Sequence, residues 1–105
     1  MNNYRERFSS LLQTQYQDRR NAILGSENSQ LLLVATGVRL LAKKSDGPLS
    51  ASEASALAGL VAHFDWLSAM ISTLQSGVLA VNQAADEPAA DAVFQSVVWP
   101  DRSAF

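Results

Sequence analysis

The stretch Leu57–Val81, LAGLVAHFDWLSAMISTLQSGVLAV, decides the fold, because it holds only two ionisable residues in twenty-five positions. With a period of 3.6 residues, its large apolar side chains fall on one continuous helical face. That face comprises Leu57, Leu60, Val61, Phe64, Leu67, Ile71, Leu74, Val78 and Val81. A narrow polar stripe on the opposite side comprises Asp65, Ser68, Ser72, Gln75 and Ser76. The pattern predicts a long amphipathic helix whose polar line faces water.

A membrane span is the first alternative for this stretch, since about 20 apolar residues can cross a bilayer. The polar stripe argues against it, and a charge such as Asp65 near the bilayer centre costs about 2.5–3.5 kcal/mol. Basic anchors are also missing from the flanks. We therefore expect no membrane span. The start of the chain, MNNYRERFSS, has no apolar run after its charges, so we expect no signal peptide and a cytoplasmic location.

Two segments before this stretch also show helical periodicity. The first runs from Tyr4 to Ile23, and Gly25 is a natural stop for it. The second runs roughly from Ser29 to Lys43, after N-cap candidates in SENSQ at 26–30. Its apolar face comprises Leu31, Val34, Ala35, Val38, Leu41 and Ala42. Three more leucines widen this face, at positions 32, 33 and 40.

Turn and capping signals set the remaining boundaries. Asp-Gly-Pro at 46–48 breaks the second helix, and Ser50 with Glu53 forms a capping box for a third helix from Ala51 to about Asn82. Asp86 and Pro88 can start a short C-terminal helix, although VFQSVVW at 93–99 could instead be an extended segment. The predicted fold is all-α, a small bundle of three main helices plus this short segment, built around the long central helix. We expect one helical domain over 1–98 and a loose tail over 99–105.

The length of the central helix bears on self-association. A compact domain of this size has a diameter of roughly 33 Å, whereas 32 helical residues span about 48 Å. The helix must overhang, break near Gly77 or belong to an elongated bundle. Its apolar face is also wider than two shorter helices can cover, which predicts a dimer or higher oligomer, or a complex with another protein. The predicted interface comprises Phe64, Trp66, Leu67, Met70, Ile71, Leu74, Phe94 and Trp99, the last two from a C-terminal segment that docks on its own bundle or on a partner.

Charge is divided unevenly along the chain. Residues 1–44 carry seven basic and three acidic side chains, a net charge of +4, and residues 45–105 carry one basic and seven acidic, a net charge of −6. This division favours attraction between the halves, within one chain or between chains. The alternative is nucleic-acid contact through Arg5, Arg7, Arg19 and Arg20 on the first helix, which the interleaved acids and the pI of about 5.1 disfavour.

Catalytic and metal-binding patterns are missing from the sequence. It has no cysteine, and its one histidine, His63, points about 200° away from Asp65 on a helix. The acidic residues Asp86, Glu87 and Asp91 do not match a calcium or magnesium loop. We therefore expect no enzyme, cofactor, metal or small-molecule ligand. The predicted function is non-enzymatic: a protein-protein interaction or assembly protein such as a structural component, adaptor, co-chaperone or inhibitor. The alternative is a small nucleic-acid-associated regulator.

Overall fold

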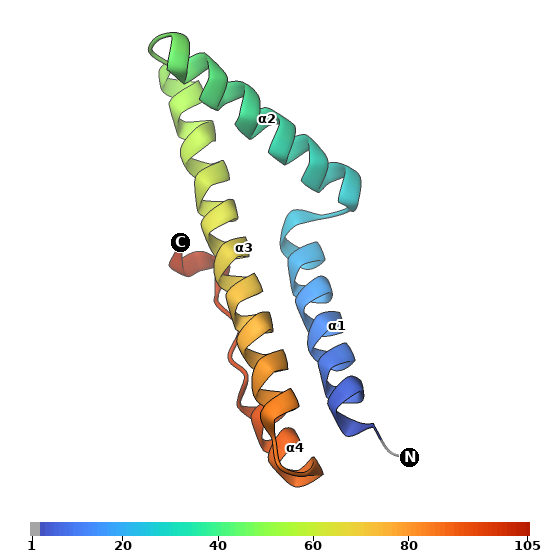
Figure 1. Ribbon diagram of the computed structural model, residues 1–105. Coiled ribbons are helices and arrows are strands. Elements are labelled where there is room, and N and C mark those ends of the chain that lie inside the picture. The colour runs from blue at the N-terminus through green and yellow to red at the C-terminus, as the bar shows by residue number, and fades with distance from the viewer. Residues whose placement is uncertain (1–2) are drawn as a thin grey trace.

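The computed structural model describes residues 3–105 and consists of helices packed around one long helix. In chain order they are α1 (Tyr4–Leu24), α2 (Glu27–Asp46), α3 (Ala51–Gln83) and α4 (Glu87–Ser96), followed by the single 3-10 turn η1 (Arg102–Ala104). No strand occurs in the described residues, so the all-α class predicted from the sequence is confirmed. Figure 1 shows α3 running the length of the molecule, with α1 beside its lower half and α2 joining its upper end.

The helix boundaries follow from the capping residues. The Ser26 hydroxyl accepts a hydrogen bond from the Ser29 amide, and Asp86 accepts from the Ala89 amide at 2.9 Å. Ser50 and Glu53 form the predicted capping box at the start of α3. Gly25 ends α1 with φ of 81°, a left-handed conformation that favours glycine.

The molecule is an elongated bundle, one of the three arrangements that the length of the central helix allows. Its principal extents are 58 × 23 × 21 Å. The helix α3 does not break at Gly77, which is buried where α1 packs closely, since a Cβ at this position would lie 3.2 Å from Leu12. Glycine thus serves close packing here rather than a bend.

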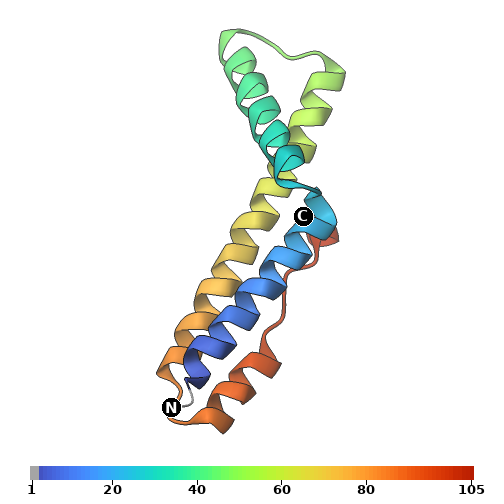
Figure 2. The same cartoon turned by 90° about the vertical axis from the view of Figure 1, so that its right-hand side faces the viewer.

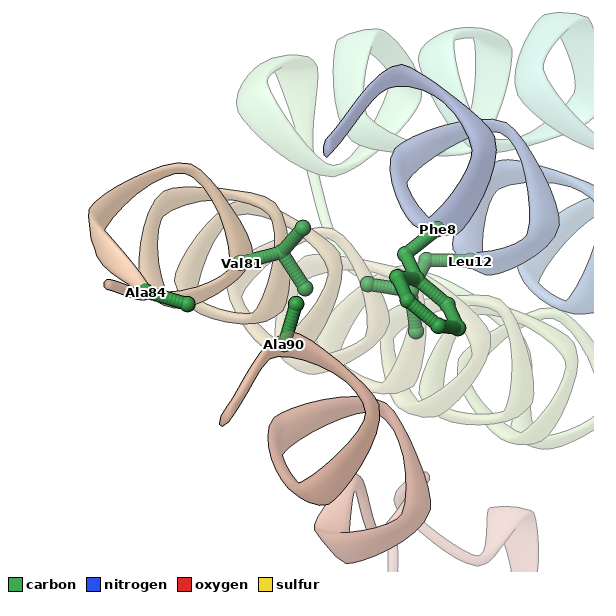
Figure 3. Packing of buried hydrophobic residues seen from close by; sticks show 5 residues of the cluster. All are labelled: Phe8, Leu12, Val81, Ala84 and Ala90. Atoms are coloured by element: carbon green, nitrogen blue, oxygen red, sulfur yellow. The ribbon is translucent and has the colours of Figure 1, made fainter. Parts of the chain in front are cut away.

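Three helices enclose the lower core. Phe8 and Leu12 of α1, Val81 at the end of α3 and Ala90 of α4 are buried together, as Figure 3 shows, and Phe94 packs its ring 5.4 Å from that of Phe8. The α4 helix folds back beside α1 and α3, so the short C-terminal helix docks on its own bundle (Figure 2).

The residues after α4 also pack against the bundle. The Trp66 indole, 2% exposed, donates a hydrogen bond to the Pro100 carbonyl oxygen at 2.9 Å, and the Trp99 indole donates to Gln15 Oε1 at 3.0 Å. Further along, the Arg102 Nε donates to His63 Nδ1 at 2.9 Å. In the segment 99–105, which we predicted to be a loose tail, Trp99, Pro100 and Arg102 therefore make specific contacts with α1 and α3. Periodicity could not reveal them because they join positions 34 to 84 residues apart.

The upper end is only two helices thick, because α1 ends at Leu24 and the C-terminal segment stops beside the middle of α3 (Figure 1). Leu40 of α2 is buried against Leu57 and Leu60 of α3. Gly37 permits this approach, since a Cβ there would lie 3.1 Å from the Phe64 ring. A pair of helices can bury one face of each and leaves the other faces open to water.

Candidate interaction surface

The open side of α2 carries a row of exposed aliphatic side chains, which we call the α2 stripe: Leu31, Val34, Val38 and Leu41. Leu31 and Val38 are 66% and 62% exposed, and the other two expose about half of their surface. Their spacing of three, four and three residues keeps them on one side of the helix, in the pattern of a coiled-coil seam. They form an apolar surface on the order of 400 Å², within the 300–600 Å² of the largest patch on a typical monomer, which is often functional.

This stripe belongs to the apolar face that the periodicity of the second helix predicts, and the structure leaves these four residues exposed. The side of α2 that packs on α3 carries Leu33, Gly37 and Leu40 instead. Both faces are apolar, so the sequence pattern did not distinguish them. The close contact at Gly37 turns the smaller face inward and leaves the α2 stripe in water.

Hollows lie near both ends of the stripe. Toward the loop between α2 and α3 there is a mainly apolar hollow of about 680 Å³, lined by Lys44, Gly47, Pro48, Leu49, Ala54, Leu57, Ala58 and Val61. Near the start of α2, a hollow of about 320 Å³ is lined by Arg20, Glu27, Gln30, Leu31 and Val34. The stripe therefore has an acidic side chain, Glu27, at its beginning and a basic one, Lys44, beyond its end. Lys43, the residue before Lys44, pairs with Glu53 of α3 at 2.6 Å.

The structure places the predicted interface residues of α3 in different environments. Trp66 and Met70 are buried with Leu24 in the chain's own core. Three others, Phe64, Leu67 and Leu74, are partly buried. Ile71 remains 42% exposed. The predicted set therefore does not form one continuous outer surface in the single chain.

The C-terminal members of the set lie against the same chain. Phe94 packs on Phe8, and the partly buried Trp99 lies near Tyr16, with ring centroids 6.5 Å apart. The exposed aliphatic residues outside the predicted interface include those of the α2 stripe. Their signal was present in the periodicity of α2, whose apolar face is wide, but the sequence did not mark which part of it is exposed.

Three of the four arginines of α1 that suggested nucleic-acid contact have partners within the chain. Arg5 donates to the Ala84 carbonyl oxygen at 3.0 Å, at the end of α3, and Arg7 pairs with Glu87 of α4. Arg20 lies 5.2 Å from the centre of the Tyr16 ring. Arg19 is exposed. The contacts of Arg5 and Arg7 join α1 to the second half of the chain, and the Arg7–Glu87 pair is of the kind that the charge division predicts.

The ionisable residues considered for chemistry have structural surroundings. Asp86 caps α4 and Glu87 pairs with Arg7, while His63 accepts from Arg102. Burial, and then the positive charge of Arg102, lower the pKa of His63 below 6.5. No group of three potential metal ligands occurs in residues 3–105.

The helix α3 is long and apolar enough to cross a membrane, judged by length and composition alone, with a mean hydropathy of 1.3 over its most apolar window. Core helices of soluble proteins, which are mostly buried, pass the same test, and 22% of this window is buried in the structure. All five residues of the predicted polar stripe, opposite its apolar face, are exposed. A polar line along α3 fits water better than lipid on that side.

Comparison of this chain with family models, with curated proteins and with solved structures finds no match. The candidate site therefore rests on the geometry of the α2 stripe and its surroundings.

Proposed function

We propose that this protein is a non-enzymatic helical interaction protein, and that it binds other protein through the α2 stripe. The observation that carries the proposal is the orientation of α2. Its four regularly spaced aliphatic residues face water, while its smaller apolar face packs on α3. Exposed apolar surface of this size, arranged as a helical seam, suits the apolar face of another helix.

The surroundings of the stripe support protein rather than nucleic acid as the ligand. The exposed stripe itself is aliphatic and cannot contact phosphate. Two of the α1 arginines, Arg5 and Arg7, are occupied at the lower end of the bundle by α3 and α4. Burial of the stripe against a helix would remove aliphatic surface from water, the main favourable term in protein association.

A pair of matched variants tests this function. Val38→Asp places a charge in the middle of the stripe, whereas Leu79→Asp places one at a similarly exposed aliphatic position, 57% exposed, on α3. Both proteins, and the unaltered chain, are used to capture partners from a lysate of the cells that produce it. Association of each with a differently tagged copy is measured in parallel.

We expect the unaltered protein and Leu79→Asp to bind the same partners or tagged copies. Val38→Asp should lose this binding, because an unpaired charge in a dry contact is costly. Circular dichroism establishes that both variants keep their helices. Equal binding by all three proteins in both assays would refute the α2 stripe as the binding surface.

A further inference from the structure

The pattern of the α2 stripe identifies an occupant. We infer that the stripe pairs with the α2 stripe of a second copy in antiparallel orientation, so that two α2–α3 hairpins form a four-helix arrangement. This inference rests on the proposed function and specifies the partner.

The first argument is the symmetry of the stripe. Its residues read Leu, Val, Val, Leu with spacings of three, four and three, a pattern that is the same in both directions about Thr36. An antiparallel pair related by a two-fold axis near Thr36 places Leu31 opposite Leu41 of the second copy, and Val34 opposite Val38. Each contact thus occurs twice, as a self-complementary interface requires.

Charge decides between the two directions. Glu27 lies one turn before Leu31, and Lys44 lies about one turn after Leu41. An antiparallel pair brings Glu27 of each copy near Lys44 of the other, whereas a parallel pair opposes Glu27 to Glu27 and Lys44 to Lys44. The antiparallel direction also sets the N-terminal end of one helix dipole beside the C-terminal end of the other.

The available area is sufficient for a dimer at the small end of the usual range. Two stripes of about 400 Å² each give roughly 800 Å² of apolar surface, and interfaces are about 56–65% apolar. The corresponding total is on the order of 1,200–1,400 Å², within the 1,200–2,000 Å² of stable interfaces. The exposed Val61 of α3 and the adjoining 680 Å³ hollow lie on the hairpin, where they can add to the contact.

Single cysteines test the direction, because the chain has none of its own. Leu31→Cys and Leu41→Cys proteins are oxidised separately and as an equimolar mixture. In the antiparallel pair the two copies of residue 31 lie about 15 Å apart along the axis, since ten residues separate positions 31 and 41. A disulfide needs Cα atoms within about 7 Å. Leu79→Cys serves as the exposed control.

We expect a disulfide between the two proteins in the mixture, and far less within either protein alone or in the control. Self-linked Leu31→Cys or Leu41→Cys at the level of the mixture would overturn the antiparallel direction while leaving the stripe as the binding surface. A mass of 11.3 kDa for the unaltered protein at all concentrations would overturn self-pairing. The proposed function would then still be decided by Val38→Asp in the capture assay, which separates the two failures.

Charge reversal provides a second readout. Glu27→Lys should weaken the dimer by roughly 3- to 10-fold at low salt, because two exposed attractive pairs become repulsive. Adding Lys44→Glu should restore most of this affinity. The melting temperature of each monomer is measured alongside, since both changes also act on the ends of α2. A double variant as weak as the single one, with an unchanged melting temperature, would overturn the pairing of these ends.

Discussion

Leu40 and Leu41 are neighbours on α2, yet the structure gives them opposite environments. Leu40 is 3% exposed against α3, and Leu41 is 53% exposed on the α2 stripe. Replacing each by alanine makes the same chemical change, and leucine and alanine have similar helix propensities. The two variants therefore measure which face of α2 the core uses.

The expected costs differ enough to be separated. Leu40→Ala removes a buried side chain and leaves a cavity beside Leu57 and Leu60, which costs about 2–5 kcal/mol. Leu41→Ala should cost roughly 1 kcal/mol or less, because about half of its side chain is already in water. One kcal/mol corresponds to about 4–8 °C in melting temperature for a domain near this size, so Leu40→Ala should lose about 10 °C or more.

Thermal unfolding by circular dichroism, at a concentration low enough to keep the chain monomeric, is the assay. At tens of micromolar the cost of Leu41→Ala should grow, because the variant also loses association that stabilises the folded unaltered protein. An equal loss of melting temperature in both variants under dilute conditions would refute the assigned orientation of α2.

Three further predictions concern the contacts around α3. Trp66→Phe removes the N–H that holds the C-terminal segment and should cost about 1–3 kcal/mol, seen as faster hydrogen exchange over residues 97–105. If exchange there is unchanged, the contact does not anchor the segment. The lowered pKa of His63 means that the folded chain favours the neutral ring, so the unfolded chain binds more protons as the pH falls below 6.5. The stability that the neutral ring contributes should be complete above pH 6.5 and should be lost as the pH falls through the lowered pKa of the folded chain, where Arg102 is released. Unfolding followed by tryptophan fluorescence measures this pH dependence, and His63→Gln should remove it. Hydrogen bonds from Lys43 and then from the cap of α3 lower the pKa of Glu53 to about 2, so its contribution to stability should hold above pH 4.5 and fall between pH 4.5 and 2. A carboxyl titration by NMR that stays near 4.5 would contradict this, and Lys43→Ala should raise the midpoint.

The helices themselves could be predicted from local sequence. Ser26, Ser50 with Glu53, and Asp86 mark helix starts, and Gly25 marks a stop, because caps satisfy backbone groups within a few residues. The exposed line that includes Asp65 also followed from periodicity. These features depend on residues close together in the chain, so sequence alone determines them.

The candidate surface depended on tertiary packing. The sequence of α2 makes both sides of the helix apolar, and periodicity did not show which side packs on the core. The contact of Gly37 with Phe64 turns the side with Leu40 toward α3. In the same way, the hydrogen bond of Trp66 to Pro100 holds a segment whose own sequence predicts only a loose tail. Sequence determined the helices and placed their ends to within a few residues. Only the tertiary structure decided which of their apolar faces remain in water, because that choice is made by residues far apart in the chain.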